Sequence, residues 1–408
     1  MSIDFFEQSI KDTLGKIKNE GRYRIFAGLE RIPDKFPKAI YHDKNGGQKE
    51  ITMWCSNDYL GLGQDKRVIH AMQNALEKYG TGAGGTRNIA GSHYLHQLLE
   101  NKLAEHHRKE QALLFTSGYV ANLTALSALS AINPIIYSDA LNHNSMIAGM
   151  RYGKASKRIF PHNDVDALEK FLAADHKANP DRPKIIAFES VYSMEATFGK
   201  IKPIVALAKK YSAITYLDEV HAVGLYGETG AGVAEQTGVM DEVDIIQGTL
   251  GKAFGQIGGY VAGKKEVIDY IRSIGHGFIF TTSLPPHVAA GAMAALDIIR
   301  KTPSLRITLS KQAKHLQKAL GAAKIPTMPS DCHIVPVVIG AADQCKIITD
   351  RLLTCHDIYI QPINYPTVPR GSERLRLTAS PLHDDELIER MVFALNKEWQ
   401  DFQLPRLT

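Results

Sequence analysis

The 408-residue sequence lacks the features that mark several classes of protein. It has only four cysteines, which form neither a CxxC pair nor the spacing of a zinc finger, so we expect neither a disulfide framework nor a structural metal site. No run of about 20 apolar residues is present that could span a bilayer. The N-terminus has neither the apolar block of a secretory signal nor the acid-poor, arginine-rich character of a transit peptide. We therefore expect a cytoplasmic protein with reduced thiols that does not enter a membrane.

The sequence also lacks a strong charge of one sign. The formal net charge is +5, and no tract of lysine and arginine interleaved with aromatic residues marks a nucleic-acid surface. We expect no nucleic-acid partner, and anionic small molecules suit the mild positive excess. Hydrophobic residues make up 44% of the chain and charged residues 22%, which is the balance of an ordinary globular protein, and the length favours two domains.

Strand and helix patterns alternate along the chain, which is typical of an α/β fold with a mostly parallel sheet. In the first part, the expected strands are Ala112–Thr116, Ile135–Ser138, Lys184–Glu189, Ile214–Asp218, Asp244–Gly248 and Gly259–Ala262, and the expected helices include Asn122–Ala131, Asp164–His176 and Lys202–Tyr211. In the second part, the expected strands are His333–Ile339, Tyr359–Pro362 and Leu375–Thr378, followed by a helix over Asp384–Phe402. We predict an N-terminal arm over residues 1–50, a large domain over 51–295 and a smaller α+β domain over 296–408.

A single lysine stands among glycines and apolar residues in the stretch GTLGKAFGQIGGYVAG, residues 248–263. The glycines indicate a chain that bends tightly and approaches its surroundings closely. The stretch is not a phosphate-binding P-loop, because Ile246 and Ala253 stand where that motif requires glycine and serine or threonine. Lys252 is either an ordinary loop lysine or an amine in a partly apolar pocket, where loss of water favours its neutral, nucleophilic form.

Polar residues gather where the expected strands end, at the edge where open α/β sheets bind their ligands. In ITYLDEVHAVG, Asp218 ends a strand and His221 follows three residues later. By themselves they could be a helix cap and a loop histidine. Together with Lys252 they form the set that pyridoxal phosphate requires: a carboxylate for the pyridinium proton, an imidazole for the phenolate oxygen and an amine that forms an imine.

Two further motifs complete this set. FTSGYVANLTAL turns from a strand into an apolar helix at Ser117 and Gly118, and the N–H groups at such a helix start favour a phosphate. SDALNHNSMI places His143 after another strand, as a flat ring that can stack on the cofactor. Each motif also has a purely structural interpretation, the first as a capped helix with a glycine turn and the second as a structural histidine.

These motifs resemble those of the α-oxoamine synthases, a family of fold-type-I pyridoxal-phosphate enzymes, and within it the 5-aminolevulinate synthase branch. TYLDEVHAVG and GTLGKAFG mark the superfamily, whereas GRYRIF, GGTRNI and INYPTVPRGSERLR indicate the branch. The resemblance covers nearly the whole chain. It implies a transferase whose mostly parallel central sheet is flanked by helices, a homodimer with shared active sites, and the compact bacterial type of enzyme.

The resemblance also implies roles for individual residues. Lys252 would hold the cofactor as an imine and then act as the base on glycine. Asp218 would pair with the pyridine nitrogen, His221 with the phenolate oxygen, and His143 would stack on the ring. The other implied cofactor residues are Ser117, Gly118, Tyr119 and Thr249 at the phosphate, Thr281 or Thr282 from the neighbouring subunit, and Ser193. The implied substrate residues are Arg376 for the glycine carboxylate, Arg24, Thr86 and Asn88 for the far carboxylate of a succinyl group, and Asn57, Ile89, Ser138 and Thr367 around the same pocket.

The implied reaction is the decarboxylative condensation of glycine with succinyl-CoA, which gives 5-aminolevulinate, CoA and carbon dioxide and is the first step of tetrapyrrole (haem) biosynthesis. Sister enzymes of the 2-amino-3-ketobutyrate CoA ligase and 8-amino-7-oxononanoate synthase types would keep the same cofactor residues. An aminotransferase or a non-catalytic cofactor-binding protein could use the same fold. The chain departs from the family pattern at Ala90, where serine is commoner, and at Glu195-Ala196-Thr197, where an acidic–glycine–acidic turn is usual. Neither change removes a group that we assign to chemistry.

Overall fold

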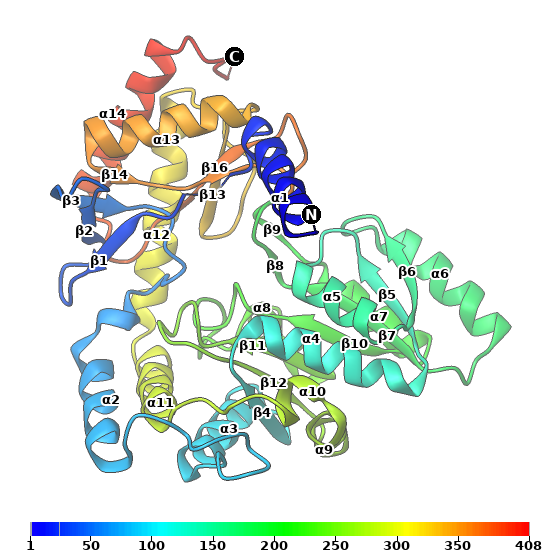
Figure 1. Ribbon diagram of the computed structural model, residues 1–408. Helices are drawn as coiled ribbons and strands as arrows, with labels where there is room; N and C mark the ends of the chain where they lie inside the picture. The colour runs from blue at the N-terminus through cyan, green and yellow to red at the C-terminus, as the bar shows by residue number, and fades with distance from the viewer. Residues whose placement is uncertain (1, 24, 408) are drawn as a thin grey trace. The chain divides into compact units, whose positions relative to one another are not determined.

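The computed structural model describes residues 2–23 and 25–407 (Figure 1). The chain forms two compact units. Unit 1 consists of Met1–Ser56, Met194–Ala196 and Leu309–Thr408, and unit 2 of Asn57–Ser193 and Thr197–Thr308. No helix in the described ranges combines the length and apolar character that a membrane crossing needs.

Unit 2 is built on a seven-stranded sheet, as the strand and helix patterns predicted. In spatial order its strands are β4 (Gln111–Phe115), β12 (Gly259–Gly263), β11 (Ile245–Thr249), β10 (Ile214–Asp218), β7 (Lys184–Glu189), β5 (Ile135–Asp139) and β6 (Ser156–Phe160). Neighbouring strands from β11 to β6 are parallel, and β12 alone runs antiparallel to both of its neighbours. The central strands are buried along their whole length and mostly apolar, which is the pattern of a sheet covered on both faces.

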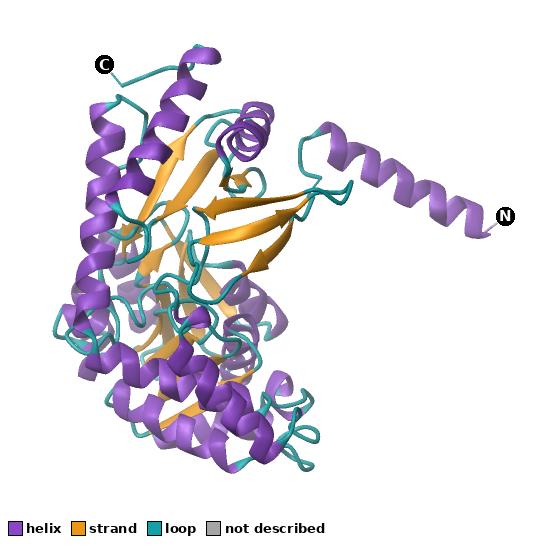
Figure 2. Ribbon diagram, turned by 90° about the vertical axis from the view of Figure 1, so that its left-hand side faces the viewer, coloured by secondary structure: helices purple, strands orange, loops and turns teal. Residues whose placement is uncertain are grey.

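Helices alternate with these strands and are shown in purple in Figure 2. The helices of unit 2 are α2 (Lys66–Tyr79), α3 (Tyr94–His106), α4 (Gly118–Leu129), α5 (Asn144–Tyr152), α6 (Val165–Ala178), α7 (Ile201–Lys210), α8 (Val233–Gln236), α9 (Lys265–Ile274), α10 (His276–Ile279) and α11 (Pro286–Lys301). Short 3-10 turns lie at Leu62–Gln64, Ser130–Ile132 and Met240–Glu242, and β8 (Val191–Tyr192) pairs with β9 (Thr197–Phe198). Helix α4 begins four residues before the expected start, because Ser117 caps it by accepting the N–H of Val120 at 3.1 Å.

Unit 1 contains two small sheets and its own apolar core. One sheet has the order β1 (Gly28–Arg31), β2 (Lys38–His42), β3 (Gln48–Met53) and β14 (Ile358–Tyr359), and the other has the order β13 (Ile334–Val338), β16 (Arg374–Thr378) and β15 (Pro362–Ile363). Its helices are α1 (Ser2–Asn19), α13 (Ala342–His356) and α14 (Asp385–Asp401), and α12 (Pro303–Ala322) runs from unit 2 into unit 1.

The observed units differ from the expected domains at two points. Residues expected to form a separate arm, together with residues 51–56 of the expected large domain, belong to the C-terminal unit, because β1 and β2 share a sheet with β14 and Trp54 lies in the same buried cluster as Leu375 and Trp399. The expected boundary at residue 295 falls within α11, which stays with unit 2. The expected strand Tyr359–Pro362 is divided between two sheets, since Tyr359 pairs with β3 and Pro362 with β16.

Candidate active site

One cavity of unit 2 gathers the residues of the separate motifs. Its volume is about 170 Å³, and it is lined by Gly118, Tyr119, Asn122, His143, Ser145, Glu189, Asp218, Val220, His221, Thr249 and Lys252. These residues lie at the ends of β4, β5, β7, β10 and β11 or in the segments that follow them. The cavity therefore forms at the edge of the sheet where an open α/β fold binds its ligand.

Asp218 is a carboxylate of this cavity that two hydrogen bonds hold in place. Its Oδ2 accepts a hydrogen bond of 2.7 Å from Nδ2 of Asn122, and its Oδ1 accepts one of 2.8 Å from the N–H of Val220. Tyr216 orients the Asn122 amide by donating from its hydroxyl to Oδ1 at 2.8 Å. Burial raises the pKa of Asp218, whereas the two donors lower it. This carboxylate is poised to receive a cation, or a protonated ring nitrogen, in the cavity.

Lys252 lies in the tight bend between β11 and β12, and the structure explains its glycine neighbours. Gly255 has a φ of +68°, and a Cβ placed there would lie 2.0 Å from the backbone nitrogen of Gly63. Only glycine permits this conformation and this approach. The positive charge of Lys252 lowers the pKa of Asp218, of His143 and of Glu189, so its amine lies near all three groups.

His221 reaches the cavity from the segment that follows β10. The hydroxyl of Tyr59 lies 2.8 Å from Nδ1 of His221 and 3.2 Å from Oδ1 of Asn57. Asn57 is exposed and does not line the cavity, so within unit 2 its link to the site runs through Tyr59. The sequence had pointed to Asn57 but not to Tyr59, which lies two residues further along the chain.

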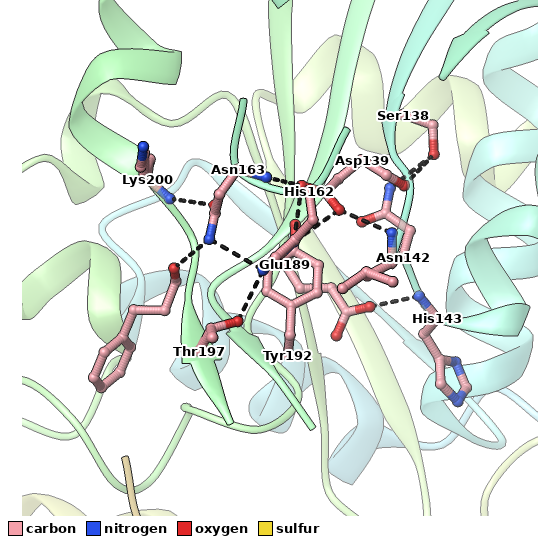
Figure 3. Close-up of polar contacts among 12 residues, drawn as sticks. Ser138, Asp139, Asn142, His143, His162, Asn163, Glu189, Tyr192, Thr197 and Lys200 are labelled. Carbon is pink, nitrogen blue, oxygen red and sulfur yellow. Dashed lines mark hydrogen bonds and ion pairs between the residues drawn. The ribbon is translucent and has the colours of Figure 1, made fainter. Parts of the chain in front are cut away.

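His143 is held at the start of α5 by its main chain and its ring. The main-chain N–H donates to Oε1 of Glu189 (Figure 3), and Nδ1 lies 2.7 Å from the hydroxyl of Ser145. The ring meets that of Tyr119 edge-on, with centroids 6.4 Å apart. Burial lowers the pKa of His143, which favours the neutral imidazole.

The start of α4 forms the end of the cavity suited to a phosphate. A Cβ at Gly118 would lie 3.2 Å from Thr249, so a glycine lets the helix start approach the end of β11 closely. The Thr249 hydroxyl is fixed because it donates to the carbonyl of Gly258 at 2.9 Å and accepts from Gly251 at 3.1 Å. The first N–H groups of a helix have no acceptor within the helix, and they attract an anion. With an amine, a carboxylate and two imidazoles in the same cavity, the residues present fit pyridoxal phosphate.

The other expected residues of unit 2 lie outside the lining of this cavity. Thr86 pairs with Thr282 in an isolated antiparallel bridge, and the N–H of Ser283 donates to the carbonyl of Gly85 at 3.0 Å. The GGTRNI motif and the threonine pair are thus side by side within one chain. Of the remaining expected residues, Ser117 caps α4, Asn88 and Ile89 are exposed, Thr281 and Ser193 are half-buried, and Ser138 is buried in β5, where its hydroxyl accepts from Asn142 at 2.9 Å.

The remaining expected substrate residues belong to unit 1. Arg24 lies outside the described residues. Thr367 lines a cavity of about 720 Å³ in this unit, together with Arg22, Tyr23, Ile25 and Phe26 among others. Arg376 is buried in β16, and burial together with its positive charge lowers the pKa of His333 to about 3.

The backbone conformation at Glu195-Ala196-Thr197 explains why the family usually has glycine at the middle position. Ala196 is fully buried and has a φ of +57°, a left-handed conformation in which glycine carries no strain. Thr197 takes up the following acidic position by placing its hydroxyl 2.9 Å from Nε2 of His162, whose Nδ1 lies 3.0 Å from Asp139 (Figure 3). Ala196 therefore adopts the left-handed conformation at a cost in strain, and His162 links the loop to Asp139 at the end of β5.

Four polar residues of the site were missed from sequence, namely Tyr59, which contacts His221, and the lining residues Asn122, Ser145 and Glu189. Asn122 and Ser145 lie inside the motifs FTSGYVANLTAL and SDALNHNSMI, Tyr59 lies two residues after Asn57, and Glu189 lies four residues before Ser193. The available signal was this closeness in sequence to a selected residue. Their contacts within the site became visible only in the folded chain.

Comparisons with known proteins agree on the kind of enzyme that this chain resembles. The model of the family "Aminotransferase class I and II" matches residues 49–395. A 5-aminolevulinate synthase of Rhizobium meliloti is 51% identical over 98% of this chain and 99% of its own length, and one of Bradyrhizobium diazoefficiens is 49% identical over 98% and 97%. Among solved structures, serine palmitoyltransferase of Sphingomonas wittichii superposes with a TM-score of 0.89 at 27% identity, covering 98% of both chains. Another with the same TM-score and identity, covering 99% of both chains, is SPT with its PLP internal aldimine. The chain belongs to the aminotransferase class I and II family and, within it, to the 5-aminolevulinate synthases, which are pyridoxal-phosphate-dependent acyltransferases.

Proposed function

We propose that this chain condenses glycine with succinyl-CoA and releases 5-aminolevulinate, CoA and carbon dioxide. The observation that carries the proposal is the meeting of Lys252, Asp218, His143 and His221 in one cavity, although they come from four separate segments. The relatives that are about half identical over their full length carry the same activity in their names.

In the proposed mechanism each of the assigned residues of the cavity has a separate role. When bound, pyridoxal phosphate supplies a ring that withdraws electrons from the carbon next to the substrate nitrogen. The carboxylate of Asp218 would keep the ring nitrogen protonated, and the N–H groups at the start of α4 would hold the phosphate. Lys252 would hold the cofactor through its amine and would take the α-proton of glycine at Nζ. His143 would lie against the ring.

Tyr59 fixes the ring of His221 through Nδ1. Its hydroxyl donates to Oδ1 of Asn57, which can only accept, so it accepts the proton of Nδ1 of His221 at 2.8 Å. Nε2 of His221 is the nitrogen that would serve the phenolate oxygen, which it would bind as an N–H donor when the imidazole is protonated. Tyr59 is therefore part of the proposed machinery.

Substrate selection is assigned to residues that bind the two carboxylates of the substrates. Arg376 binds the carboxylate of glycine, and Arg24, Thr86 and Asn88 bind the far carboxylate of the succinyl group. Asn57, Ile89, Ser138 and Thr367 complete the acyl pocket. An arginine that must pair with a carboxylate discriminates strongly, because an uncharged acyl tail leaves it unpaired.

The proposed enzyme is a cytoplasmic homodimer. Thr281 and Thr282 of the partner subunit would complete the phosphate site. Exposed apolar side chains beside these threonines and beside Asn88 suit an interface between subunits, since Phe280 is 74% exposed and Ile89 is 82% exposed. A reducing compartment suits the four cysteines, which are all unpaired.

The test is release of CoA in the presence of glycine and three acyl donors. We expect succinyl-CoA to be used with a kcat/KM at least about tenfold above those of acetyl-CoA and pimeloyl-CoA. Preference for acetyl-CoA would instead indicate the 2-amino-3-ketobutyrate type, and preference for pimeloyl-CoA the 8-amino-7-oxononanoate type.

A further inference from the structure

Glu189 is a buried carboxyl group in the Lys252 cavity to which the motifs gave no role. It ends β7 and is the cross-strand partner of Asp218, which ends the parallel strand β10. Partners in register on parallel strands project to the same face of the sheet, so two carboxyl groups stand side by side. Glu189 is only 4% exposed, and it lines the cavity together with Asp218 and Lys252.

The two oxygens of Glu189 have different surroundings. Oε1 accepts the main-chain N–H of His143, as Figure 3 shows. The preceding residue, Asn142, donates from Nδ2 to the carbonyl of Ala187 at 2.7 Å, so the segment that carries His143 is tied to β7 at two points. Oε2 has no hydrogen-bond partner among residues 2–23 and 25–407.

Two neighbouring buried carboxyl groups cannot both ionise without a large cost, so one of them keeps a proton. Asp218 accepts two hydrogen bonds that favour its anion, from Asn122 and Val220, whereas Glu189 accepts one. Burial and the charge of Asp218 raise the pKa of Glu189 well above its ordinary range. The other charged groups that act on Glu189 oppose each other, because Lys252 lowers this pKa and Asp139 raises it.

We propose that Glu189 is a positioning residue that stands in the cavity as an uncharged carboxylic acid. Its Oε1 fixes the main chain of His143, its proton lies on Oε2 and faces the cavity, and Asp218 remains the anion. The inference rests on the proposed function, in which His143 must keep its ring flat on the cofactor and Asp218 must stay ionised. A charged Glu189 would oppose the ionised state of Asp218, because it would draw a proton onto that carboxylate.

The protonation state can be measured directly by infrared spectroscopy of the cofactor-free protein. A protonated carboxyl group absorbs at its own C=O stretching frequency, which shifts in heavy water. We expect the wild-type protein to show such a band at about pH 8 and Glu189→Gln to lack it. Glu219→Gln is the matched control, because Glu219 is also a buried glutamate at the end of β10 but does not line the cavity. This control should keep the band. Absence of the band from the wild type, or its survival in Glu189→Gln, overturns the proposal.

A second readout uses the enzyme loaded with pyridoxal phosphate. Glutamine copies an uncharged carboxyl group, so Glu189→Gln should shift the pH midpoint of the lysine–cofactor absorbance by less than about 0.3 unit. A downward shift of about one unit or more would mean that a negative charge had been removed, which contradicts the proposal.

Truncation tests the contact with His143. Glu189→Ala leaves the His143 N–H without its acceptor, and the affinity of the cofactor-free protein for pyridoxal phosphate should fall about tenfold or more, whereas Glu189→Gln should hold it within about threefold. Equal affinity of Glu189→Ala and the wild type would remove the positioning role. If instead the wild type formed no lysine-linked cofactor, the proposed function would fail, and the infrared result on Glu189 would still stand.

Discussion

Asn122 donates a hydrogen bond of 2.7 Å from Nδ2 to Oδ2 of Asp218, and the hydroxyl of Tyr216 holds the amide in this orientation. The contact joins the first turn of α4 to the end of β10. The N-terminal part of α4 therefore contributes both to the proposed phosphate site, through its first N–H groups, and to the support of Asp218, through Asn122. Because both contributions come from one helix, their spacing is fixed by that helix.

Asn122→Ala should therefore weaken the charged form of Asp218. Loss of a hydrogen bond to a charged group costs about 1.5–3 kcal/mol, so kcat/KM should fall about 10-fold to 150-fold. Because the lost donor had lowered the pKa of Asp218, the acid limb of the pH profile should move to higher pH. Thr124→Val, on the same helix, is the control and should leave the profile unchanged, since the buried Thr124 hydroxyl has no hydrogen-bond partner in the part of the chain that the structure describes. An unmoved acid limb in Asn122→Ala would contradict the assignment.

Tyr59→Phe tests the contact that holds His221. Without the hydroxyl at 2.8 Å, Nδ1 loses its acceptor and the proton can shift from Nδ1 to Nε2. We expect kcat to fall about tenfold with a smaller change in the KM for glycine, because the ring contact of His221 is altered and the carboxylate site is not. Nitrogen-15 NMR of the labelled histidines measures the tautomer. A His221 signal identical in both proteins would show that Tyr59 does not set it.

Much of the fold and of the site could be predicted from the sequence. The strands of unit 2 are short apolar runs that end in polar residues, and this pattern located β5, β7 and β10 to within one residue. Lys252 was selected because a lysine is unusual among glycines and apolar residues, and Asp218 and His143 were selected because they stand where expected strands end. The pairing of β3 with β14 was not predictable, because two residues of contact between distant segments leave no periodic signal. Glu189 was missed for a similar reason, since its role depends on a register shared with Asp218.

Ala196→Gly tests the strain in the loop after β8. An alanine at φ +57° carries about 1–2 kcal/mol of strain, whereas glycine costs about 0.5–1 kcal/mol of chain entropy and removes a buried methyl group worth about 0.8 kcal/mol. These contributions nearly cancel, so the free energy of unfolding should change by less than about 0.5 kcal/mol. Ala208→Gly in α7 has no strain to relieve and should lower it by about 1.5 kcal/mol. Equal losses in denaturant titrations of the two variants would exclude strain at Ala196.

Glu219 should give the folded protein a distinct dependence on pH. Burial raises its pKa to about 7, although the N–H groups of Val233 and Ala234 donate to its carboxylate. Between about pH 4.5 and 7 the folded state binds this proton more tightly than the unfolded state does, so the contribution of Glu219 to stability falls as the pH rises through this window. Glu219→Gln cannot titrate. The difference in unfolding free energy between the two proteins should therefore change by about 1–3 kcal/mol across the window and stay constant above it. A constant difference throughout would mean that Glu219 is already ionised at pH 5.

Lys252→Ala tests the residue on which the proposed chemistry depends. Removal of the amine should abolish the absorbance of the lysine–cofactor linkage and lower turnover by at least about a thousandfold, because no other group in the cavity can take both its roles. Borohydride reduction followed by peptide mapping should place the cofactor on the peptide containing Lys252 in the wild type and on no peptide in the variant. Lys264→Ala is the control, since this exposed lysine lies twelve residues further along, just before α9. Its labelling and turnover should match the wild type. A reduced adduct on Lys264, or normal turnover of Lys252→Ala, would require a different nucleophile and with it a different site.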